Sequence, residues 1–279
     1  MNNYIEWFKK NKITEVECLI PDNSGIPRGK ILPTKKFLSS FESGGLRLPL
    51  HLFKLAVSRS VSYSIDDQLL NPTDGDFILK PDFNTLRVVP WYEEPTAQII
   101  CDAVDSKENE IEVYSRGILK RVISLFNNIG LEPIIAPEIE FYLVKKNNDP
   151  DYPLETPSGQ SGRIEKGNQS YGIDAINEFD HIFEDLYDYC EPQDLDVENI
   201  NHEDGPAQME INFKHGNPLD LADQVFLFKR TLRQTALKHN LYATFMAKPL
   251  EDSPGNSMHI HQSLLKKGKP VFVNKDLNT

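Results

Sequence analysis

Short apolar runs bounded by turn residues dominate the first hundred residues of the chain. Runs of this length, flanked by Gly, Pro, Asn and Asp, are typical of β-strands. We predict strands at residues 16–22, 29–33, 87–91 and 96–102. Asn-Pro-Thr-Asp-Gly at 71–75 is a strong turn signal between the second and third of them. After a short N-terminal helix, this pattern indicates a strand-rich domain over residues 1–108, ending in the charged stretch 105–110.

Helical periodicity appears after residue 109, where apolar residues recur every three or four positions in three segments. We predict helices around residues 119–126, 179–190 and 217–239, the last with Asn217 as its N-cap, and we interpret the apolar stripes of the first two as core faces. Strand-like runs lie between them, at 134–144, 208–213, 243–247 and 257–261. These elements predict a second domain over residues 109–279, with the polar segment 147–170 as a flexible loop.

The chain of 279 residues is acidic, with 42 Asp and Glu against 30 Lys and Arg, a net charge of −12. It has no dense basic cluster, which argues against a nucleic-acid partner. Cys18, Cys101 and Cys190 lie far apart without a CxxC pair, which argues against a disulfide scaffold and fits a reducing compartment. Because no signal peptide and no apolar run of roughly 20 residues is present, we predict a cytoplasmic protein without a membrane partner.

Two carboxylates stand two residues apart in the apolar run 137–142, as Glu138 and Glu140. On a strand such residues project from the same face. They repel each other unless a positive charge lies between them. Two readings follow from this pair alone: both groups are solvated at a sheet edge, or they share a metal ion.

Two further segments carry similar groups. Glu203 precedes a Gly-Pro turn, and Glu210 lies inside an apolar strand pattern, where an ordinary solvent-facing Glu is the simpler interpretation. His259 and His261 share one face of a strand, as a zinc pair or a surface pair would. The turn before them contains Gly255, and its backbone amides could bind a carboxylate or a phosphate.

Taken together, these segments place four carboxylates and two histidines on short strands. Such a set suits Mg²⁺ or Mn²⁺ better than zinc, which prefers Cys and several His. Ions of this kind normally serve phosphate chemistry. Neither the GxxxxGK[ST] phosphate loop nor GxGxxG occurs in the sequence, so the two commonest nucleotide-binding folds are excluded.

In their order and spacing, the three segments resemble the glutamine synthetase superfamily, from about residue 13 to the last residue. The motifs are PEIEFY at 137–142, His-Glu at 202–203 with QMEIN at 208–212, and Lys-Pro at 248–249 with PGNSMH at 254–259 and Ser263. The resemblance implies an α+β fold: a β-grasp N-terminal domain, then a catalytic domain built on an antiparallel sheet with flanking helices. It also implies a homo-oligomer, with a dodecameric double ring as the form of a full-length protein.

The resemblance also implies roles for single residues, with two or three Mg²⁺ or Mn²⁺ ions and ATP as substrate. The family's metal ligands match Glu140, Glu203 and Glu210 at one site, and Glu138 and His259 at another. Its ATP contacts match His261, Ser263 and, more loosely, Glu198. A glycine that holds glutamate matches Gly255.

The implied activity is an ATP-dependent ligase that phosphorylates the γ-carboxylate of glutamate and joins it to an amine. Ammonia-using members carry an Asp in the small domain, which the comparable stretch 41–49 lacks. They also have Asn-Gly where this chain has Pro254 and Gly255. Both features resemble the γ-glutamylpolyamine synthetase branch. Ammonia-using glutamine synthetase and a non-catalytic family member or fragment are the alternatives.

Members of the family continue past the position that matches residue 279. The resemblance therefore predicts a catalytic domain that is incomplete at its C-terminus. The part that follows in the family supplies arginines for the phosphates and for the glutamate α-carboxylate, one more metal-ligand Glu and a flap Glu. Impaired catalysis is expected without them, since cationic groups stabilise the developing phosphoryl charge.

Overall fold

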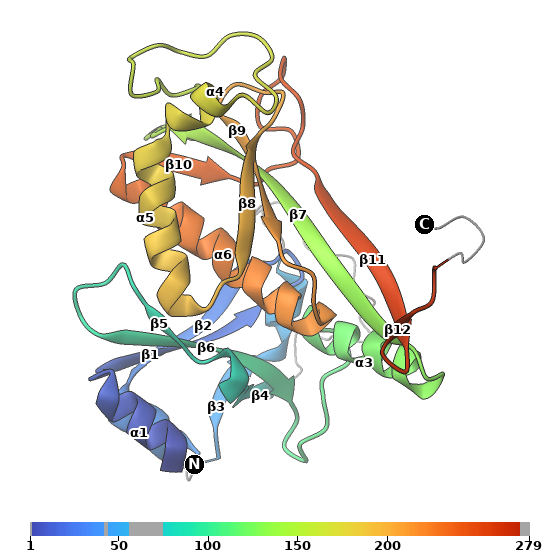
Figure 1. The fold of residues 1–279 in the computed structure, drawn as a ribbon. Helices are drawn as coiled ribbons and strands as arrows, with labels where there is room; N and C mark the ends of the chain where they lie inside the picture. The colour runs from blue at the N-terminus through green and yellow to red at the C-terminus, as the bar shows by residue number, and fades with distance from the viewer. Residues whose placement is uncertain (1, 42–43, 56–74, 274–279) are drawn as a thin grey trace. The chain divides into compact units, whose positions relative to one another are not determined.

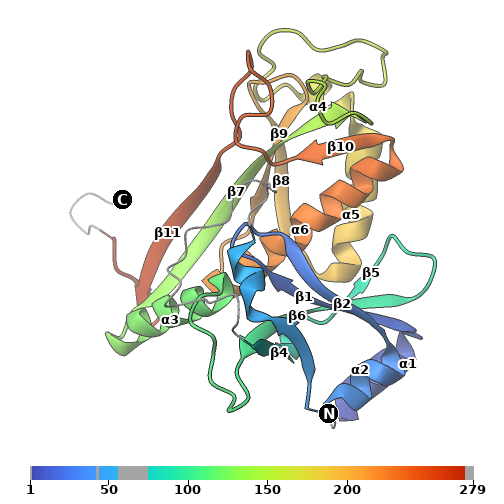
Figure 2. The same cartoon turned by 180° about the vertical axis from the view of Figure 1, so that it is seen from behind.

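The computed structural model describes residues 2–41, 44–55 and 75–273, so most of the predicted turn at 71–75 lies outside the described residues. Within them the chain forms two compact units, Met1–Ile129 and Gly130–Thr279 (Figures 1 and 2). Both units combine helices and strands, which confirms the α+β class. No helix of the described residues is both long enough and apolar enough to span a bilayer.

The first unit is built around a mixed sheet. Its elements are α1 (Asn2–Lys10), β1 (Glu15–Pro21), β2 (Pro27–Pro33), α2 (Thr34–Ser40), β3 (Leu46–Pro49), η1 (Leu50–Lys54), β4 (Asp76–Pro81), η2 (Phe83–Thr85), β5 (Arg87–Val89), β6 (Thr96–Val104) and α3 (Ser115–Asn128). The strand order is β2-β1-β6-β4-β3, with β5 also on β6. β1 and β6 pair in parallel and the other pairs are antiparallel. A parallel central pair is what a β-grasp domain requires, and all four predicted strands are present.

Aromatic side chains fill the core of this unit. Phe37, Phe53 and Phe77 have no exposed surface, and Phe53 stacks on Phe77 with ring centroids 5.0 Å apart. Each such side chain buries a large apolar area and so contributes strongly to the stability of the unit. Cys18 and Cys101 are buried free thiols, in agreement with the absence of a disulfide framework.

Helix α3 belongs to the first unit, so the compact units divide at residue 129, whereas the sequence placed the domain boundary at 108. Arg116 anchors the first turn of the helix through ion pairs with Asp82 at 2.6 Å and Asp102 at 2.5 Å. Its predicted apolar stripe is only partly covered, because Leu119, Ile123 and Phe126 are half-buried. The prediction that the stripe is a core face is wrong at Val122, which is 42% exposed.

The second unit is built on an antiparallel sheet. Its elements are β7 (Glu132–Lys145), α4 (Ile173–Asn177), α5 (Asp180–Cys190), η3 (Glu191–Gln193), β8 (Val197–His202), β9 (Gln208–Phe213), α6 (Pro218–Lys238), β10 (Leu241–Thr244), β11 (Met258–Lys266) and β12 (Lys269–Pro270). The strand order is β12-β11-β7-β9-β8, with β10 pairing the far end of β7. The two runs predicted inside 134–144 are one long strand, β7, which crosses the unit (Figure 1).

One face of this sheet is apolar and is covered by helices. Ile139, Phe141 and Ile211 are at most 3% exposed, and α6 packs against β7 and β10 while α5 packs on α6. The predicted stripe of α5 is buried, as expected. Because side chains alternate along a strand, the polar residues between these apolar ones face the opposite side.

Asn217 caps the N-terminus of α6, as the sequence predicts. Its side-chain oxygen accepts hydrogen bonds from the backbone amides of Leu219 at 2.9 Å and Asp220 at 3.5 Å. We expect Asn217→Ala to lower the free energy of unfolding by about 1 kcal/mol, because it leaves these donors without a side-chain partner. Urea denaturation measures this loss. Asn217→Ser should restore most of it, and equal losses for both variants would contradict the cap.

Candidate functional site

Strand register gathers the acidic side chains on the polar face of the second sheet. Glu140 of β7 lies opposite Glu210 of β9. Two residues along, Glu138 lies opposite Asn212 on one side and His259 of β11 on the other. These groups share one face because they are directly opposite one another or two residues apart along a strand.

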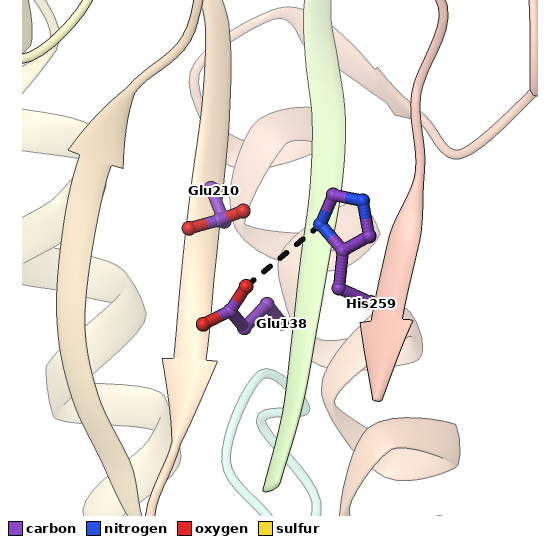
Figure 3. Close-up of side chains that lie close together, drawn as sticks. All are labelled: Glu138, Glu210 and His259. Carbon is purple, nitrogen blue, oxygen red and sulfur yellow. Dashed lines mark ion pairs between the residues drawn. The ribbon is translucent and has the colours of Figure 1, made fainter. Parts of the chain in front are cut away.

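Glu138, Glu210 and His259 come close enough to share a metal ion (Figure 3). One ligand atom from each lies within 4.8 Å of the others. The Nδ1 atom of His259 is 3.8 Å from a carboxylate oxygen of Glu138. The cluster joins residues that the sequence assigned to two different metal sites, because β9 and β11 flank β7 at the same level.

His261 extends this cluster along β11. Its Nε2 atom lies 3.0 Å from Oε1 of Glu138, while its side chain is 67% exposed. His259 is exposed to a similar degree. Both imidazoles therefore stand at the open side of the cluster, with Glu210 buried behind them.

Glu140 is held rigidly by groups from two distant segments. Its Oε2 accepts hydrogen bonds from the backbone amide of Ser257 at 3.0 Å and from Nε2 of Gln208 at 3.1 Å. Its Oε1 accepts one from the hydroxyl of Ser257 at 2.5 Å. Three donors fix the orientation of this buried carboxylate.

Gln208 also connects the hairpin before β9 to the loop before β11. Its Nε2 lies 3.0 Å from the carbonyl oxygen of Gly255 and 3.1 Å from Oδ1 of Asn256. Its Oε1 accepts from the amide of Gly205 at 2.9 Å. A side chain on Gly255 would have to fit 2.6 Å from the carbonyl oxygen of Ala247, so glycine is needed for this close approach.

Glu203 lies just after β8, at the start of the hairpin turn that leads into β9. Its amide donates to the carbonyl of Gln208 at 2.8 Å, and its own carbonyl accepts from Nδ1 of His202 at 2.7 Å. The other nitrogen of the buried His202 ring lies 3.1 Å from Glu165. Burial lowers the pKa of His202, but these two acceptors favour a proton on each ring nitrogen and raise the pKa overall.

The negative charges gathered on this sheet face favour the binding of a cation. Burial raises the pKa of Glu210, and the charges of Glu138 and Glu140 raise it further. Burial also raises the pKa of Glu203, to which Glu140 and Glu210 add. Like charges held together in this way are unfavourable unless a positive charge compensates them.

The donor set fits a divalent cation that prefers oxygen. Two carboxylates and one imidazole lie within reach of one point, with further carboxylates beside them. Such a set suits Mg²⁺ or Mn²⁺ rather than a structural zinc site. The buried Oδ1 of Asn212, on the same face as Glu138, has no hydrogen-bond partner among the described residues and is free to accept from a metal-bound water.

Three of the predicted ligand-binding residues lie outside the carboxylate cluster. Ser263 is half-buried on β11, four residues beyond His259 and on the same face of the strand. Glu198 is exposed at the irregular start of β8. Gly255 accepts from Gln208, whose side chain also donates to Glu140. Their predicted roles toward ATP and glutamate stay predictions.

Comparison with known proteins shows the family to which this chain belongs. Residues 112–279 match the family described as glutamine synthetase, catalytic domain. The chain belongs to the glutamine synthetase family. All three motifs on which the resemblance was based lie within the matched residues. The family is an ATP-dependent and divalent-metal-dependent one in general, in agreement with the oxygen-rich donor set described above.

Two curated relatives illustrate the range of acceptors in this family. The glutamine synthetase of Methanocaldococcus jannaschii is 33% identical over 275 residues, which are 98% of this chain and 57% of the relative. The glutamate–isopropylamine ligase of a Pseudomonas species is 29% identical over 273 residues, 97% of this chain and 59% of the relative. The chain thus spans less than two thirds of the length of either relative.

Solved structures share the fold. The structure of GmaS without ligand matches with a TM-score of 0.80 at 21% identity, covering 99% of this chain and 60% of that one. A GmaS–ADP complex matches with a TM-score of 0.77 at 22% identity, over 99% of this chain and 59% of that one. These matches cover both units of the chain.

Proposed function

We propose that this chain carries the metal-binding part of an ATP-dependent ligase that joins glutamate to an amine. The observation that supports it most is the cluster of Glu138, Glu210 and His259, with Glu140 beside it on the same sheet face and Glu203 close by in the hairpin turn. Family membership supplies the reaction class. The reaction transfers the γ-phosphoryl group of ATP to the γ-carboxylate of glutamate, and the amine then displaces phosphate.

The carboxylates and His259 would hold the divalent cations. A bound Mg²⁺ or Mn²⁺ would supply the positive charge that offsets the phosphoryl oxygens of ATP. Glu140 is fixed in place because Ser257 and Gln208 donate to it. Glu203 would reach the same ions from the hairpin turn.

The substrates are assigned to the two sides of this cluster. We place ATP beside β11, where His261 and Ser263 share the face of His259, with Glu198 as a further contact from β8. We place glutamate at the loop that contains Gly255. The hydroxyl of Tyr142 donates to the carbonyl of Pro254 at 2.7 Å and holds this loop. Burial and the charge of Glu140 raise the pKa of Tyr142 to about 12, so its hydroxyl remains a donor.

An organic amine is the acceptor that we favour over ammonia. The sequence lacks the small-domain Asp of ammonia-using members and has Pro254 before Gly255, and the isopropylamine-using relative supports the same choice. The similarly close archaeal glutamine synthetase supports ammonia as the second candidate. Assembly into a homo-oligomer and a cytoplasmic location stay predictions.

ADP release tests this proposal. The chain is incubated with Mg-ATP, glutamate and one of ammonium, methylamine, ethanolamine, putrescine or spermidine. We expect the fastest release with an organic amine and none with Glu138→Gln, while Glu132→Gln on the same strand keeps the activity. Turnover with ammonium that matches or exceeds every amine would favour glutamine synthetase. Absence of turnover with every acceptor would favour a non-catalytic family member or fragment.

A further inference from the structure

A pair of cations surrounds one aromatic ring on the helix-covered side of the second unit. The Nζ atom of Lys229 lies 5.0 Å from the centroid of the Phe245 ring, and Cζ of Arg233 lies 5.1 Å from it. Lys229 and Arg233 are four residues apart on α6, so their side chains leave the same helix face. Both side chains are half-buried.

The described residues give this pair no negative counterpart. Among the described residues, no Asp or Glu forms an ion pair or hydrogen bond with Lys229 or Arg233. Burial lowers the pKa of Lys229, and the charge of Arg233 lowers it further. Burial also lowers the pKa of Arg233. Like charges at this helical spacing repel each other, and partial burial strengthens that repulsion.

Another lysine of the same helix shows the usual arrangement. Lys238 pairs with Asp185 of α5 at 2.8 Å, and this ion pair raises its pKa. The Phe245 ring offsets only part of the two charges beside it, because an aromatic quadrupole attracts a cation weakly compared with an anion. The ring also restricts the two head groups to one small region.

We propose that Lys229 and Arg233 form a binding site for a small oxyanion, a phosphate or a carboxylate. The planar guanidinium suits two oxygens of such a ligand, and the ammonium supplies a third donor. The site is independent of the proposed ligase function. Its aromatic ring contacts Phe141, which is buried on the face of β7 opposite to Glu138 and Glu140.

Thermal denaturation and calorimetric titration with inorganic phosphate test this site. Phosphate replaces chloride at constant ionic strength in the metal-free protein, and acetate serves as the carboxylate probe in a parallel series. We expect a saturable rise of the denaturation midpoint with phosphate, with acetate, or with both. Arg233→Gln and Lys229→Met should each weaken the apparent affinity by about tenfold or more, since each removes a charge-assisted hydrogen bond.

Lys238→Met is the matched control, because it removes the same charge from the same helix but from a residue that already has Asp185 as partner. It should keep the anion response. Without added anion, Arg233→Gln should raise the midpoint by relieving repulsion, whereas Lys238→Met should lower it. Two results would overturn the site: no saturable response to either anion, or an equal response in all three variants and the unmodified protein.

Discussion

Glu210→Gln is expected to stabilise the metal-free protein and to remove most of the stabilisation that Mn²⁺ gives to it. Glu210 is 8% exposed and lies against Glu138 and Glu140, which raise its pKa together with burial. Neutral Gln keeps the shape of the side chain and the hydrogen bond from Asn201, but it removes the repulsion. It also removes one of the three ligands that lie within reach of one ion.

The size of the effect follows from binding linkage. Mn²⁺ at about 100 times its dissociation constant stabilises a folded protein by roughly 2.7 kcal/mol. For a domain of this size, that corresponds to a rise of about 5–10 °C in the thermal midpoint. Scanning fluorimetry with and without MnCl₂ measures it. The variant should show a higher midpoint without metal and a shift of less than about 2 °C with it.

Glu132→Gln is the control, since Glu132 is an exposed residue of the same strand outside the cluster. It should leave both midpoints unchanged. Identical curves with and without Mn²⁺ in the unmodified protein would contradict the metal assignment itself. If the Glu210→Gln variant without metal is less stable than the unmodified protein, repulsion between Glu210 and its neighbouring carboxylates does not destabilise the fold.

The same carboxylates predict how stability depends on pH without metal. Because the pKa of Glu203 and of Glu210 is raised in the folded state, these two groups bind more protons in the folded protein than in the unfolded chain between about pH 4.3 and their folded pKa. Stability therefore falls as the pH rises from that value through the folded pKa, and it stays low above it. Glu210→Gln should flatten this fall in denaturation series across pH 4–8.

Local patterns predicted the parts of the fold whose residues repeat regularly. β9 begins and ends where alternation in 208–213 placed it, and Asn217 caps α6. β8 escaped prediction because Glu198, Asn199 and Asn201 give it no apolar alternation. Its place in the sheet comes from pairing with β9, which local propensity does not contain.

The candidate site could be predicted as a set of residues but not as an arrangement. Each carboxylate alone was compatible with a solvent-facing side chain, and family resemblance was needed to combine them. Grouping Glu138 with Glu210 and His259 required the register of three strands. The role of Glu165 could not be predicted from the sequence. Glu165 lies in the polar segment 147–170, which was expected to be flexible, and its partner His202 is 37 positions away.

Glu165→Ala is expected to lose much of its stability, because it removes the contact between Glu165 and His202. Glu165 accepts from the amide of Ala207 at 2.6 Å and pairs with the ring of His202, which has no exposed surface. Removing one partner leaves a buried charge uncompensated, and we expect a cost of about 3 kcal/mol. The hairpin between β8 and β9 should loosen, and with it the position of Glu203.

Chemical denaturation measures the cost, and two further variants identify its cause. Glu165→Gln can keep the bond to Ala207 while losing the charge, so an intermediate loss is expected. Glu155→Ala in the same loop breaks only the exposed pair with Lys145 and should cost less than about 1 kcal/mol. If Glu165→Ala and Glu155→Ala show equally small losses of stability, the pair of Glu165 with His202 stabilises the protein no more than an exposed ion pair does.

The pH profile separates the ion pair from simple packing. Burial lowers the pKa of His202, but Glu165 and the carbonyl of Glu203 outweigh burial and raise it overall. Its contribution is therefore complete below the unfolded pKa of about 6.5 and is lost as the pH rises through the folded pKa. Glu165→Ala should remove this loss at alkaline pH. If the unmodified protein and the variant lose stability in parallel above pH 7, His202 is not held as an imidazolium by Glu165.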